Sequence, residues 1–508
     1  MRASGRDAVI GLDLGTSSMK GLLVTVDGAA WEQARAAYPM HSPQPGWNEN
    51  DPQDWWTAFC EVVTELTGRA GVLGWRVRGL GVVAQRDPFV LLDAGGNPVT
   101  RAISWTDQRT HEEVARLRAT FGDEHLVRVT GTRPIVGQGL PNLMWTMRHL
   151  PGVWSQAARA VAPKDFLLHR LLAAAPAVTD PTTPSRSLAY DIERGAWSDE
   201  ILDAAGIPST LFDLTDSAPW ERAGEVDPAV AASLGLPLDL VVAVGGADDQ
   251  AATLGAGAVR PGEVCLGTGT CSGWRLVLDG YRPDVSGRGD TYPHVVPDRY
   301  IREVTIDSTG SSLRWFVRTL AADLGGYDEV IALAATAPVG AAGVRFFPYV
   351  DGGQRAPHFL DAGTGVFVGI TSFHDRAHLA RAVLEGITMQ YPRTWEILRE
   401  GNAVPVSGLT MVDAEAASLT WTKIKADVLG EPVRLPAITA GAATGAAVLA
   451  ATAAGIHGSV TDAAQAMVHM GTTVEPDPAG VQAYRAVAQR YETDMAVLRP
   501  LLSTGGVR

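Results

Sequence analysis

The amino-terminal part of the chain alternates apolar runs of strand length with short turns of small or polar residues. Residues 9–13 and residues 21–26 are apolar runs that predict two buried strands. The segment between them, residues 14–18, reads Leu-Gly-Thr-Ser-Ser. Asp27 and Gly28 follow the second run, and this pair favours a hairpin turn because both residues accept a positive φ. The pattern therefore predicts two paired strands joined by a small-residue turn.

Farther along the chain, helical and strand-like spacings of the apolar positions alternate. The mid-chain strand ends in Gly-Gly-Ala-Asp-Asp, and the last predicted helix stops before Pro500. This mixture indicates an α/β protein. The predicted helices cover residues 54–66, 110–121, 142–149, 251–258 and 481–498, and the further strands cover residues 77–83, 89–92 and 240–244.

The turn near the amino terminus has a counterpart about half a chain later. Residues 266–270 read Leu-Gly-Thr-Gly-Thr and, like residues 14–18, they follow one apolar strand and precede another. A repeat at this spacing indicates two copies of one kind of domain rather than a solenoid. We therefore expect an amino-terminal domain at residues 1–243 and a carboxy-terminal domain at residues 244–508.

The composition is that of a large, folded, acidic protein. The 508 residues suggest two to four domains, and a hydrophobic content of 46% is enough to build large cores. The net charge of −14, without a Lys/Arg run, argues against a nucleic-acid partner. Three cysteines do not make a disulfide framework, no apolar run reaches the length of a membrane span, and the polar start does not resemble a secretory signal. We therefore expect a cytoplasmic protein that makes no membrane contact.

The two small-residue turns are candidate anion sites. In such a turn, backbone N–H groups and hydroxyls converge on one point, which suits phosphate oxygens. Two such turns facing each other would hold a triphosphate, whereas the alternative is that each is an ordinary tight hairpin. The residues concerned are Gly15, Thr16, Ser17 and Ser18 in the first turn and Gly267, Thr268, Gly269 and Thr270 in the second.

Asp13 ends the first predicted strand, directly before the first turn. A carboxylate beside a phosphate is repelled unless a cation lies between them, and Mg²⁺ is the usual cation in that position. The alternative is an aspartate that caps the turn. Lys20 follows the turn, either as a phosphate contact or as an exposed side chain.

Asp248 and Asp249 follow the mid-chain strand. A kinase that acts on an alcohol needs a carboxylate to accept the hydroxyl proton, and Asp248 is the candidate for that base. Asp249 would accept a hydrogen bond from a polyhydroxy ligand. The alternative for Asp248 is a capping role at the start of the next helix.

Gln85, Arg86 and Asp87 follow another predicted strand, and Trp105 comes soon afterwards. Amide and charged side chains beside an indole ring match the way in which proteins hold sugars, through hydrogen-bond forks and stacking on C–H surfaces. Taken alone, an Arg-Asp pair is most often a solvated surface pair.

Several longer motifs are similar to those of one known family. Residues 365–370 read Gly-x-Phe-x-Gly-Ile, and after seven residues His-Leu-x-x-Ala-Val-Leu-Glu follows at residues 378–385. On these motifs the chain resembles the FGGY family of carbohydrate kinases over nearly its whole length. Shorter motifs agree: Asp-Pro-x-x-Trp-Trp at residues 51–56, Ile-Ser-Trp-x-Asp-x-Arg at 103–109, Pro-Lys-Asp-Phe-Leu at 163–167 and Phe-Pro-Tyr at 347–349.

The resemblance implies an α/β chain with the two-domain actin-like ATPase (ribonuclease H-like) fold, in which ATP and a sugar meet in an interdomain cleft. It implies ATP and Mg²⁺ as cofactors, with Asp13 and the first turn as the metal and first phosphate site and residues 267–270 as the second. By the same likeness Asp248 is the general base. The sugar contacts that it implies are Gln85, Arg86, Asp87, Trp105 and Asp249.

Three segments depart from the family pattern. The first is Pro141-Asn142, where the family's amino-terminal signature normally has Pro-Lys. Xylulokinases usually carry Met-His where this chain has Arg86 and Asp87, and Gln-Arg-Asp looks more like the Gln-Arg-Glu of glycerol kinases, although the surrounding pattern resembles xylulokinases. At the adenosine site the family has a glycine-rich turn, which here becomes Asp413, Ala414 and Glu415. Either the backbone differs there, or nucleotide affinity is lower, or the donor is unusual. Glu415 is also expected to add negative charge near the phosphates.

We therefore expect a kinase that transfers a phosphoryl group from ATP to a hydroxyl of a small sugar or polyol, with a ketopentose such as xylulose favoured. The alternatives are a glycerol- or tetritol-type polyol kinase and a degenerate protein that binds a sugar without phosphorylating it. Both turns and Asp248 should converge on one crevice. The expected partner is a small-molecule substrate, and assembly as a homodimer stays open.

Overall fold

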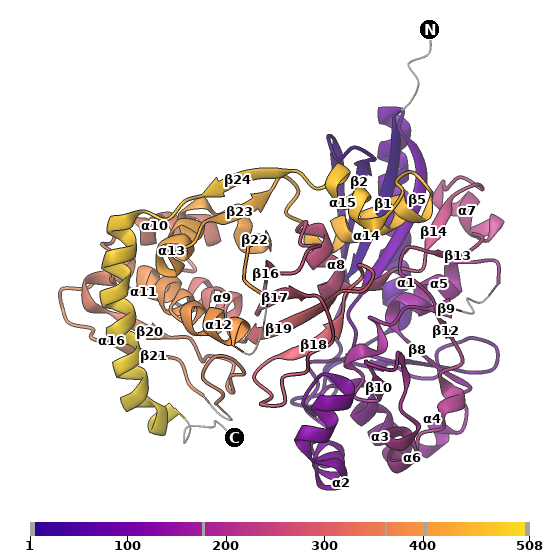
Figure 1. Cartoon of the computed structure of the whole chain (residues 1–508), viewed down its shortest axis with the longest axis horizontal. Coiled ribbons are helices and arrows are strands. Elements are labelled where there is room, and N and C mark those ends of the chain that lie inside the picture. The colour runs from indigo at the N-terminus through magenta and orange to yellow at the C-terminus, as the bar shows by residue number, and fades with distance from the viewer. Residues whose placement is uncertain (1–5, 175–177, 361–362, 401–403, 503–508) are drawn as a thin grey trace. The chain divides into compact units, whose positions relative to one another are not determined.

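The computed structural model describes residues 6–174, 178–360, 363–400 and 404–502 (Figure 1). They form two compact units. Unit 1 takes the described parts of Met1–Val259, Leu278–Ile301 and Ala440–His469, and unit 2 takes those of Arg260–Val277, Arg302–Thr439 and Met470–Arg508. This division differs from a single boundary between residues 243 and 244, because the start of the second half and two later segments pack with unit 1.

Unit 1 is built around a mixed sheet. The first strand pairs antiparallel with the second, as the sequence predicts, and on its other side it runs parallel to β5. Gly28, in the turn after the second strand, has the positive φ of 70° that the Asp-Gly pair predicts. In spatial order the strands are β13 (Arg222–Gly224), β14 (Val241–Ala243), β5 (Arg76–Ala84), β1 (Asp7–Leu14), β2 (Ser18–Thr25) and β3 (Trp31–Ala37), and β15 (Gly246–Ala247) also pairs with β5.

Helix α14 (Gly441–Ala453) approaches this sheet through positions that lack side-chain bulk. A Cβ atom at Gly11 of β1 would lie 2.0 Å from the carbonyl oxygen of Ala443, and one at Gly81 of β5 would lie 2.3 Å from that of Ala446. Neither position can hold a larger residue, because contacts this short are far inside van der Waals distance. The backbone of the helix therefore packs directly on the two central strands.

The same helix also packs closely on α8 (Asp248–Gly255). A Cβ atom at Gly445 would lie 1.9 Å from the carbonyl oxygen of Ala251. The alanine-rich run at residues 442–455 is therefore explained by backbone packing in the core. In the part of the chain that the structure describes, no helix combines the length and apolar character needed to cross a membrane.

The other elements of unit 1 include α1, α5 and α7, which pack in the core of the sheet, and α2, α3 and α6, which share a separate core. Helix α1 starts after Asp51, whose side chain accepts a hydrogen bond from the backbone of Gln53 at 2.9 Å. The elements of unit 1 outside the sheet, α8 and α14 are β4 (Glu49–Asn50), α1 (Pro52–Leu73), β6 (Val90–Leu92), β7 (Ala102–Ile103), α2 (His111–Thr130), α3 (Gly139–His149), α4 (Pro151–Trp154), β8 (Arg159–Val161), α5 (Pro163–Leu171), β9 (Val178–Thr179), η1 (Pro184–Arg186), β10 (Tyr190–Asp191), β11 (Ala196–Trp197), α6 (Asp199–Ala205), η2 (Ser209–Leu211), β12 (Thr215–Asp216), α7 (Pro228–Leu234), β18 (Asp290–Pro293) and α15 (Val460–Met467).

Unit 2 repeats the central arrangement of unit 1. Strand β16 pairs antiparallel with β17 across the second small-residue turn, and on its other side it runs parallel to β22. The prediction of two equivalent strand-turn-strand units is confirmed by this match in pairing. The strands lie in the order β19 (Tyr300–Ile306), β17 (Ser272–Leu278), β16 (Glu263–Thr268), β22 (Gly408–Asp413), β23 (Val433–Pro436) and β24 (Met470–Val474).

The last helix of unit 2 is longer than the sequence predicts. It continues through Pro500 to Leu502, where the predicted helix ended before the proline. A proline this close to a helix end removes one ladder hydrogen bond, and the buried side chain of Leu502 holds the last turn. The remaining elements are α9 (Gly310–Leu320), α10 (Tyr327–Ala335), η3 (Ala341–Gly343), β20 (Arg345–Phe347), β21 (Val366–Val368), α11 (Arg376–Thr388), α12 (Tyr391–Arg399), η4 (Ala414–Ala417), α13 (Leu419–Leu429) and α16 (Pro478–Leu502).

The close packing of α14 predicts that replacing a helical glycine by alanine has opposite effects on stability at two positions. Gly445→Ala should lower the free energy of unfolding by about 1–3 kcal/mol, because the new methyl group overlaps the backbone of α8. Gly68→Ala in α1 should leave stability unchanged or raise it by up to about 1 kcal/mol, because a Cβ there meets no atom within 4 Å. Urea unfolding measures both variants, and equal effects would contradict the packing described for α14.

Candidate active site

Three strands of unit 1 end together, and each leads into a residue predicted to be functional. Asp13 of β1 and Gly246 of β15 both lie opposite Val83 of β5. Because these strands are parallel, their carboxyl ends meet at one end of the sheet. Gln85 follows β5 directly, and Asp248 follows β15. The fold therefore brings Asp13, Gln85 and Asp248 to one place.

The first small-residue turn is fixed from three directions. Inside the turn, the N–H of Gly15 donates to the carbonyl oxygen of Ser18 at 3.1 Å. The hydroxyl of Tyr38 donates to the carbonyl oxygen of Gly15. The indole N–H of Trp105, which was predicted to contact a sugar, donates to the Thr16 hydroxyl at 2.9 Å. Tyr38 was not predicted from the sequence, and it helps to hold a backbone loop in one conformation.

Asp13 is paired with a lysine at this end of the sheet. Its carboxylate lies 3.3 Å from the ammonium group of Lys20, which is 47% exposed, whereas the aspartate is buried. Burial raises the pKa of Asp13, Lys20 opposes that rise, and the charge of Asp249 adds to it. Lys20 is therefore an ion-pair partner of Asp13 in this structure, which neither of the two sequence interpretations foresaw.

Asp248 is the first residue of α8 and is partly buried beside two other carboxylates. Removal of its carboxyl group from bulk water raises its pKa to about 8, and the charges of Asp249 and Asp13 contribute to the rise. Arg86 acts in the opposite direction. The carboxylate of Asp248 also accepts a hydrogen bond from the N–H of Asp249 at 2.8 Å, within the first turn of the helix. The helix therefore begins three residues before the predicted start, and it carries the predicted base at its first position.

Arg86 and Asp87 are both engaged in ion pairs. The buried guanidinium of Arg86 donates to the carboxylate of Asp249 at 2.7 Å and lies 4.6 Å from the centre of the Tyr292 ring. The guanidinium of Arg186 donates to Asp87 at 2.7 Å. The interpretation as a solvated surface pair is wrong for these residues, because Arg86 and Asp87 are both buried.

Gln85 differs from its two neighbours. Its side chain is 4% exposed, and within the described ranges neither atom of its amide has a hydrogen-bond partner. Its backbone N–H donates to the carbonyl oxygen of Leu14 at 3.2 Å, which ties it to the end of β1. A buried amide without partners is unfavourable by itself, so Gln85 is available for a polar group that enters this end of the sheet.

A buried polar network holds the residue that precedes Asp248. The hydroxyl of Thr182 accepts the N–H of Ala247 at 2.9 Å and donates to the carboxylate of Asp180. Asp180 in turn lies 3.3 Å from the ammonium group of Lys164. This network was not predicted from the sequence. The run Asp-Pro-Thr-Thr was a usable signal, because an acid followed by threonines favours a side-chain-bonded turn.

The second small-residue turn, in unit 2, meets the start of a helix. The N–H of Gly269 donates to the carbonyl oxygen of Cys271 at 3.0 Å, and that of Ser311 in α9 donates to the carbonyl oxygen of Thr270 at 3.2 Å. A Cβ atom at Gly310 would lie 2.1 Å from the carbonyl oxygen of Gly269, so glycine allows this approach. The turn is therefore backed by the amino end of α9.

Thr268 and residues 413–415 are joined by hydrogen bonds. The hydroxyl of Thr268 donates to the carbonyl oxygen of Val412 at 2.9 Å and accepts the N–H of Glu415 at 3.0 Å. This hydroxyl therefore connects the second turn to the segment that replaces the family's glycine-rich turn. Asp413 has φ 70° and ψ −151°, a region that is otherwise almost restricted to glycine and costs about 1–3 kcal/mol for other residues. The segment keeps a glycine-like backbone without glycine.

The expectation that Glu415 adds negative charge near phosphates is wrong, because its charge is balanced internally. Glu415 and Lys425 are both buried and form an ion pair. Burial lowers the pKa of Lys425, while Glu415 acts against that decrease. The ammonium group lies 4.2 Å from the ring centre of Trp421. Ala414 lies beside Glu415 at the start of η4.

The structure therefore gathers the predicted residues into two groups, one in each unit. This grouping follows from the strand ends and from the two turns. The group in unit 1 comprises Asp13, Gly15, Thr16, Ser17, Ser18, Lys20, Gln85, Arg86, Asp87, Trp105, Asp248 and Asp249, and the group in unit 2 comprises Gly267, Thr268, Gly269, Thr270, Ala414 and Glu415.

The raised pKa of Asp248 predicts the pH dependence of stability. In the unfolded chain this aspartate has an ordinary pKa near 4, while in the folded chain its pKa is about 8. Ionisation is therefore easier in the unfolded state, and the folded state loses stability as the pH rises between these two values. Asp248→Asn removes this loss, so its stability relative to the parent protein should rise from about pH 4 to about pH 8 and then level off.

Urea unfolding over this pH range measures the effect. Asp203→Asn, at an exposed position of α6, is the matched control for the loss of one carboxylate. A difference between parent and Asp248→Asn that does not change with pH would show that Asp248 ionises with its ordinary pKa.

Comparison with known proteins covers most of the chain. The N-terminal domain of the FGGY family of carbohydrate kinases matches residues 8–255, and the C-terminal domain of that family matches residues 262–454. The two matches leave six residues between them, close to the start of the second repeated strand.

Full-length relatives carry two different kinase names. The chain is 31% identical to a xylulose kinase of Lactococcus lactis over 490 residues, which is 95% of each protein. It is also 31% identical to a glycerol kinase of Alkalilimnicola ehrlichii, over 89% of this chain and 91% of that one. The crystal structure of xylulose kinase from Rhodospirillum rubrum has 31% sequence identity and a TM-score of 0.83, with 97% of this chain and 99% of that chain covered. The predicted two-domain, actin-like α/β fold is confirmed, and the chain belongs to the FGGY family of carbohydrate kinases, which makes it a phosphotransferase.

Proposed function

We propose that the chain transfers the γ-phosphoryl group of ATP, in the presence of Mg²⁺, to a hydroxyl of a small sugar or polyol, and that its substrate is a ketopentose such as xylulose. The observation that carries this proposal is the meeting of Asp13, the first turn and Asp248 at the end of β1, β5 and β15. An acceptor hydroxyl and a phosphate group need these three functions within one site. The xylulose kinase relatives support the choice of substrate.

Asp248 is the proposed general base. A base works best when its pKa is close to the pH at which the enzyme operates, and the surroundings of Asp248 raise its pKa to about 8. Thr182 supports the backbone just before this residue through the N–H of Ala247. Asp248 would accept the proton of the sugar hydroxyl as its oxygen attacks the γ-phosphorus.

The carboxylates at this end of the sheet fit a magnesium ion. Asp13 is buried with a raised pKa, and Asp249 adds to the negative potential around it, so a divalent cation would relieve the crowding. The described residues include no group of three or more metal-binding side chains. Mg²⁺ is commonly held by one or two carboxylates and by the phosphates and waters of its nucleotide. When bound, Mg²⁺ neutralises charge on the transferred group.

The second turn and residues 413–415 are the proposed nucleotide side, in unit 2. N–H groups at the turn and at the start of α9 suit phosphate oxygens. Two features of this segment argued against nucleotide binding: the negative charge of Glu415 and the loss of the family's glycines. The internal Glu415–Lys425 pair removes the first objection, and the glycine-like conformation of Asp413 removes the second. These features favour a working kinase over a protein that binds a sugar without phosphorylating it.

The sugar side has features of both candidate substrates. Gln85 offers a buried amide without partners in the described chain, which suits a hydroxyl of any polyol. Arg86 is held by Asp249, and Asp87 by Arg186. The Gln-Arg-acid sequence and the glycerol kinase relative keep a glycerol- or tetritol-type substrate as the second candidate.

Asp248→Asn tests the proposed base. The variant should lose turnover by about 10²–10⁴-fold, because proton transfer to a positioned carboxylate accounts for a factor of this size. Sugar binding should change by less than about threefold, since the amide keeps the shape of the side chain. A coupled assay of ADP release measures turnover, and calorimetry measures binding.

Asp203→Asn is the control in the same two assays, because it removes one acidic group far along the chain from the proposed base. Turnover in Asp248→Asn equal to that of the parent would rule out Asp248 as the base. Loss of sugar binding together with turnover would assign it to substrate positioning instead.

A substrate panel tests the choice of sugar. Pentuloses, hexuloses, tetritols and glycerol should be compared by kcat/KM in the ADP-release assay. We expect xylulose to exceed glycerol by at least about tenfold, which is about 1.4 kcal/mol of transition-state binding. A higher value for glycerol or a tetritol would identify the chain as a polyol kinase, and turnover with no member of the panel would contradict the substrate class.

A further inference from the structure

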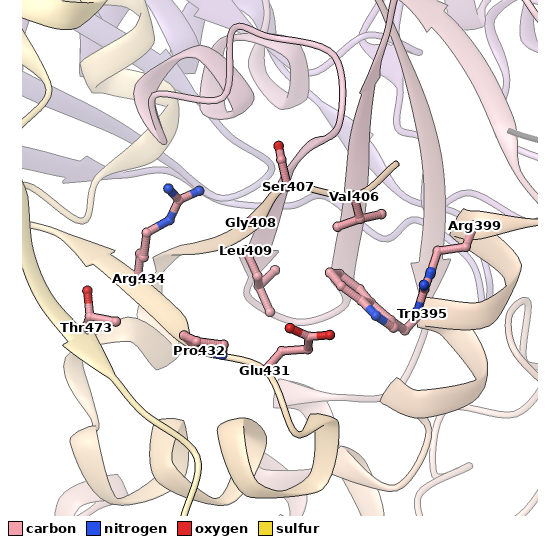
Figure 2. A pocket seen from close by; sticks show the side chains of 10 residues that line it. All are labelled: Trp395, Arg399, Val406, Ser407, Gly408, Leu409, Glu431, Pro432, Arg434 and Thr473. Atoms are coloured by element: carbon pink, nitrogen blue, oxygen red, sulfur yellow. The ribbon is translucent and has the colours of Figure 1, made fainter. Parts of the chain in front are cut away.

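Unit 2 contains a pocket that the proposed phosphoryl transfer does not use. Its volume is about 320 Å³, at the lower end of the range for small-molecule sites. Its walls come from α12, the beginning of β22 with the two residues before it, the loop before β23, β23 itself and β24 (Figure 2).

This pocket lies at the opposite end of the sheet from the second small-residue turn. Gly408, the first residue of β22, lines it, whereas Asp413 is the last residue of the same strand and is followed by Ala414 and Glu415. Six residues of strand separate these ends by about 16 Å. A ligand in this pocket would therefore occupy a site distinct from the proposed nucleotide side.

Three charged side chains line the pocket: Arg399, Glu431 and Arg434. Figure 2 shows the two arginines on opposite sides, with Glu431 between them. No ion pair or side-chain hydrogen bond joins any of the three to another residue of the described chain, and the Nε atom of Arg434 is buried without a partner. A buried guanidinium nitrogen without an acceptor is unfavourable, so an oxyanion that entered the pocket would supply the missing acceptor.

The position of Arg434 depends on a glycine. A Cβ atom at Gly408 would lie 2.4 Å from Nη2 of Arg434 and 2.8 Å from its Cζ. The guanidinium therefore lies directly against the backbone of β22, which fixes the orientation of its planar fork. Preorganised guanidinium groups bind phosphates and carboxylates in a bidentate manner.

The remaining walls combine hydroxyls with apolar surface. Ser407 and Thr473 add hydroxyl groups near Arg434, and Trp395 and Leu409 supply apolar contacts (Figure 2). Glu431 offers a carboxylate that accepts hydrogen bonds from hydroxyl groups. In a chain with a net charge of −14, two guanidinium groups that face one pocket form a local attraction for anions.

We propose that this pocket binds a small hydroxylated molecule that carries an oxyanion, such as a sugar phosphate or a sugar acid, with the oxyanion on Arg434 and hydroxyls on Glu431. This assignment does not depend on the substrate of the phosphoryl transfer. Phosphate esters and carboxylates share the chemistry that a guanidinium recognises, and the experiment separates them.

Calorimetric titration of the full-length protein tests the proposal. The probes are glucose 6-phosphate and gluconate, with uncharged glucose as the reference. We expect at least one of the two anions to bind more tightly than glucose, and Arg434→Met to weaken its binding at least about tenfold, since a charge-assisted bidentate contact is lost. Preference for glucose 6-phosphate identifies a phosphate site, and preference for gluconate identifies a carboxylate site.

Three further variants make the result specific. Gly408→Ala keeps every charge but displaces the guanidinium, so it should weaken binding as well, and it carries the test if Arg434→Met does not fold. Arg393→Met removes an exposed arginine from the same helix as Arg399 without touching the pocket, and Asp248→Asn alters the proposed active site. Both should bind the anion as the parent does. Failure of both anions to bind, or equal binding by the parent, Arg434→Met and Gly408→Ala, overturns the proposal.

Discussion

Carboxylate crowding at the end of β1, β5 and β15 is the constraint on which the chemistry of unit 1 depends. Asp13, Asp248 and Asp249 meet there, and the cations that counter them are Lys20 and Arg86. Two positive charges against three carboxyl groups leave one negative charge unbalanced. The fold relieves this by raising the pKa of Asp248 to about 8, so that a proton balances the charge while no further cation is bound. A cation brought by a nucleotide would take the place of this proton and favour the ionised form of Asp248 that the proposed base requires.

The parts of this site that lie close in sequence could be predicted, and the parts that lie far apart could not. Each small-residue turn joins two strands that are neighbours along the chain, so apolar periodicity and glycine content were sufficient to find both. The ion pair of Arg86 with Asp249 spans 163 residues, and the hydrogen bond of Thr182 to Ala247 spans 65. Such pairings depend on the crossing of strands, and one sequence does not indicate which of many polar residues meet.

The departure from the family at residues 413–415 shows how packing can change the meaning of a substitution. From sequence alone, three glycines exchanged for bulkier or charged residues indicate a damaged nucleotide site. In the fold, Asp413 takes a conformation that glycine prefers, and Glu415 turns inward to Lys425. Lys425 lies ten residues further on, in α13, where helical spacing gave no reason to link it with Glu415. At residues 413–415, this chain therefore has a buried ion pair where the family has conformationally free glycines.

The glycine-lined contact of α14 with β1 and β5 also has a consequence for protein synthesis. The sheet of unit 1 begins at the seventh residue, but the helix that covers its central strands comes from Gly441–Ala453. Domains usually fold as units as the ribosome releases them, starting from the amino terminus. Here the amino-terminal unit emerges first and is completed almost last, after unit 2 has largely been made. During that interval the face of its two central strands that α14 later covers is without this cover.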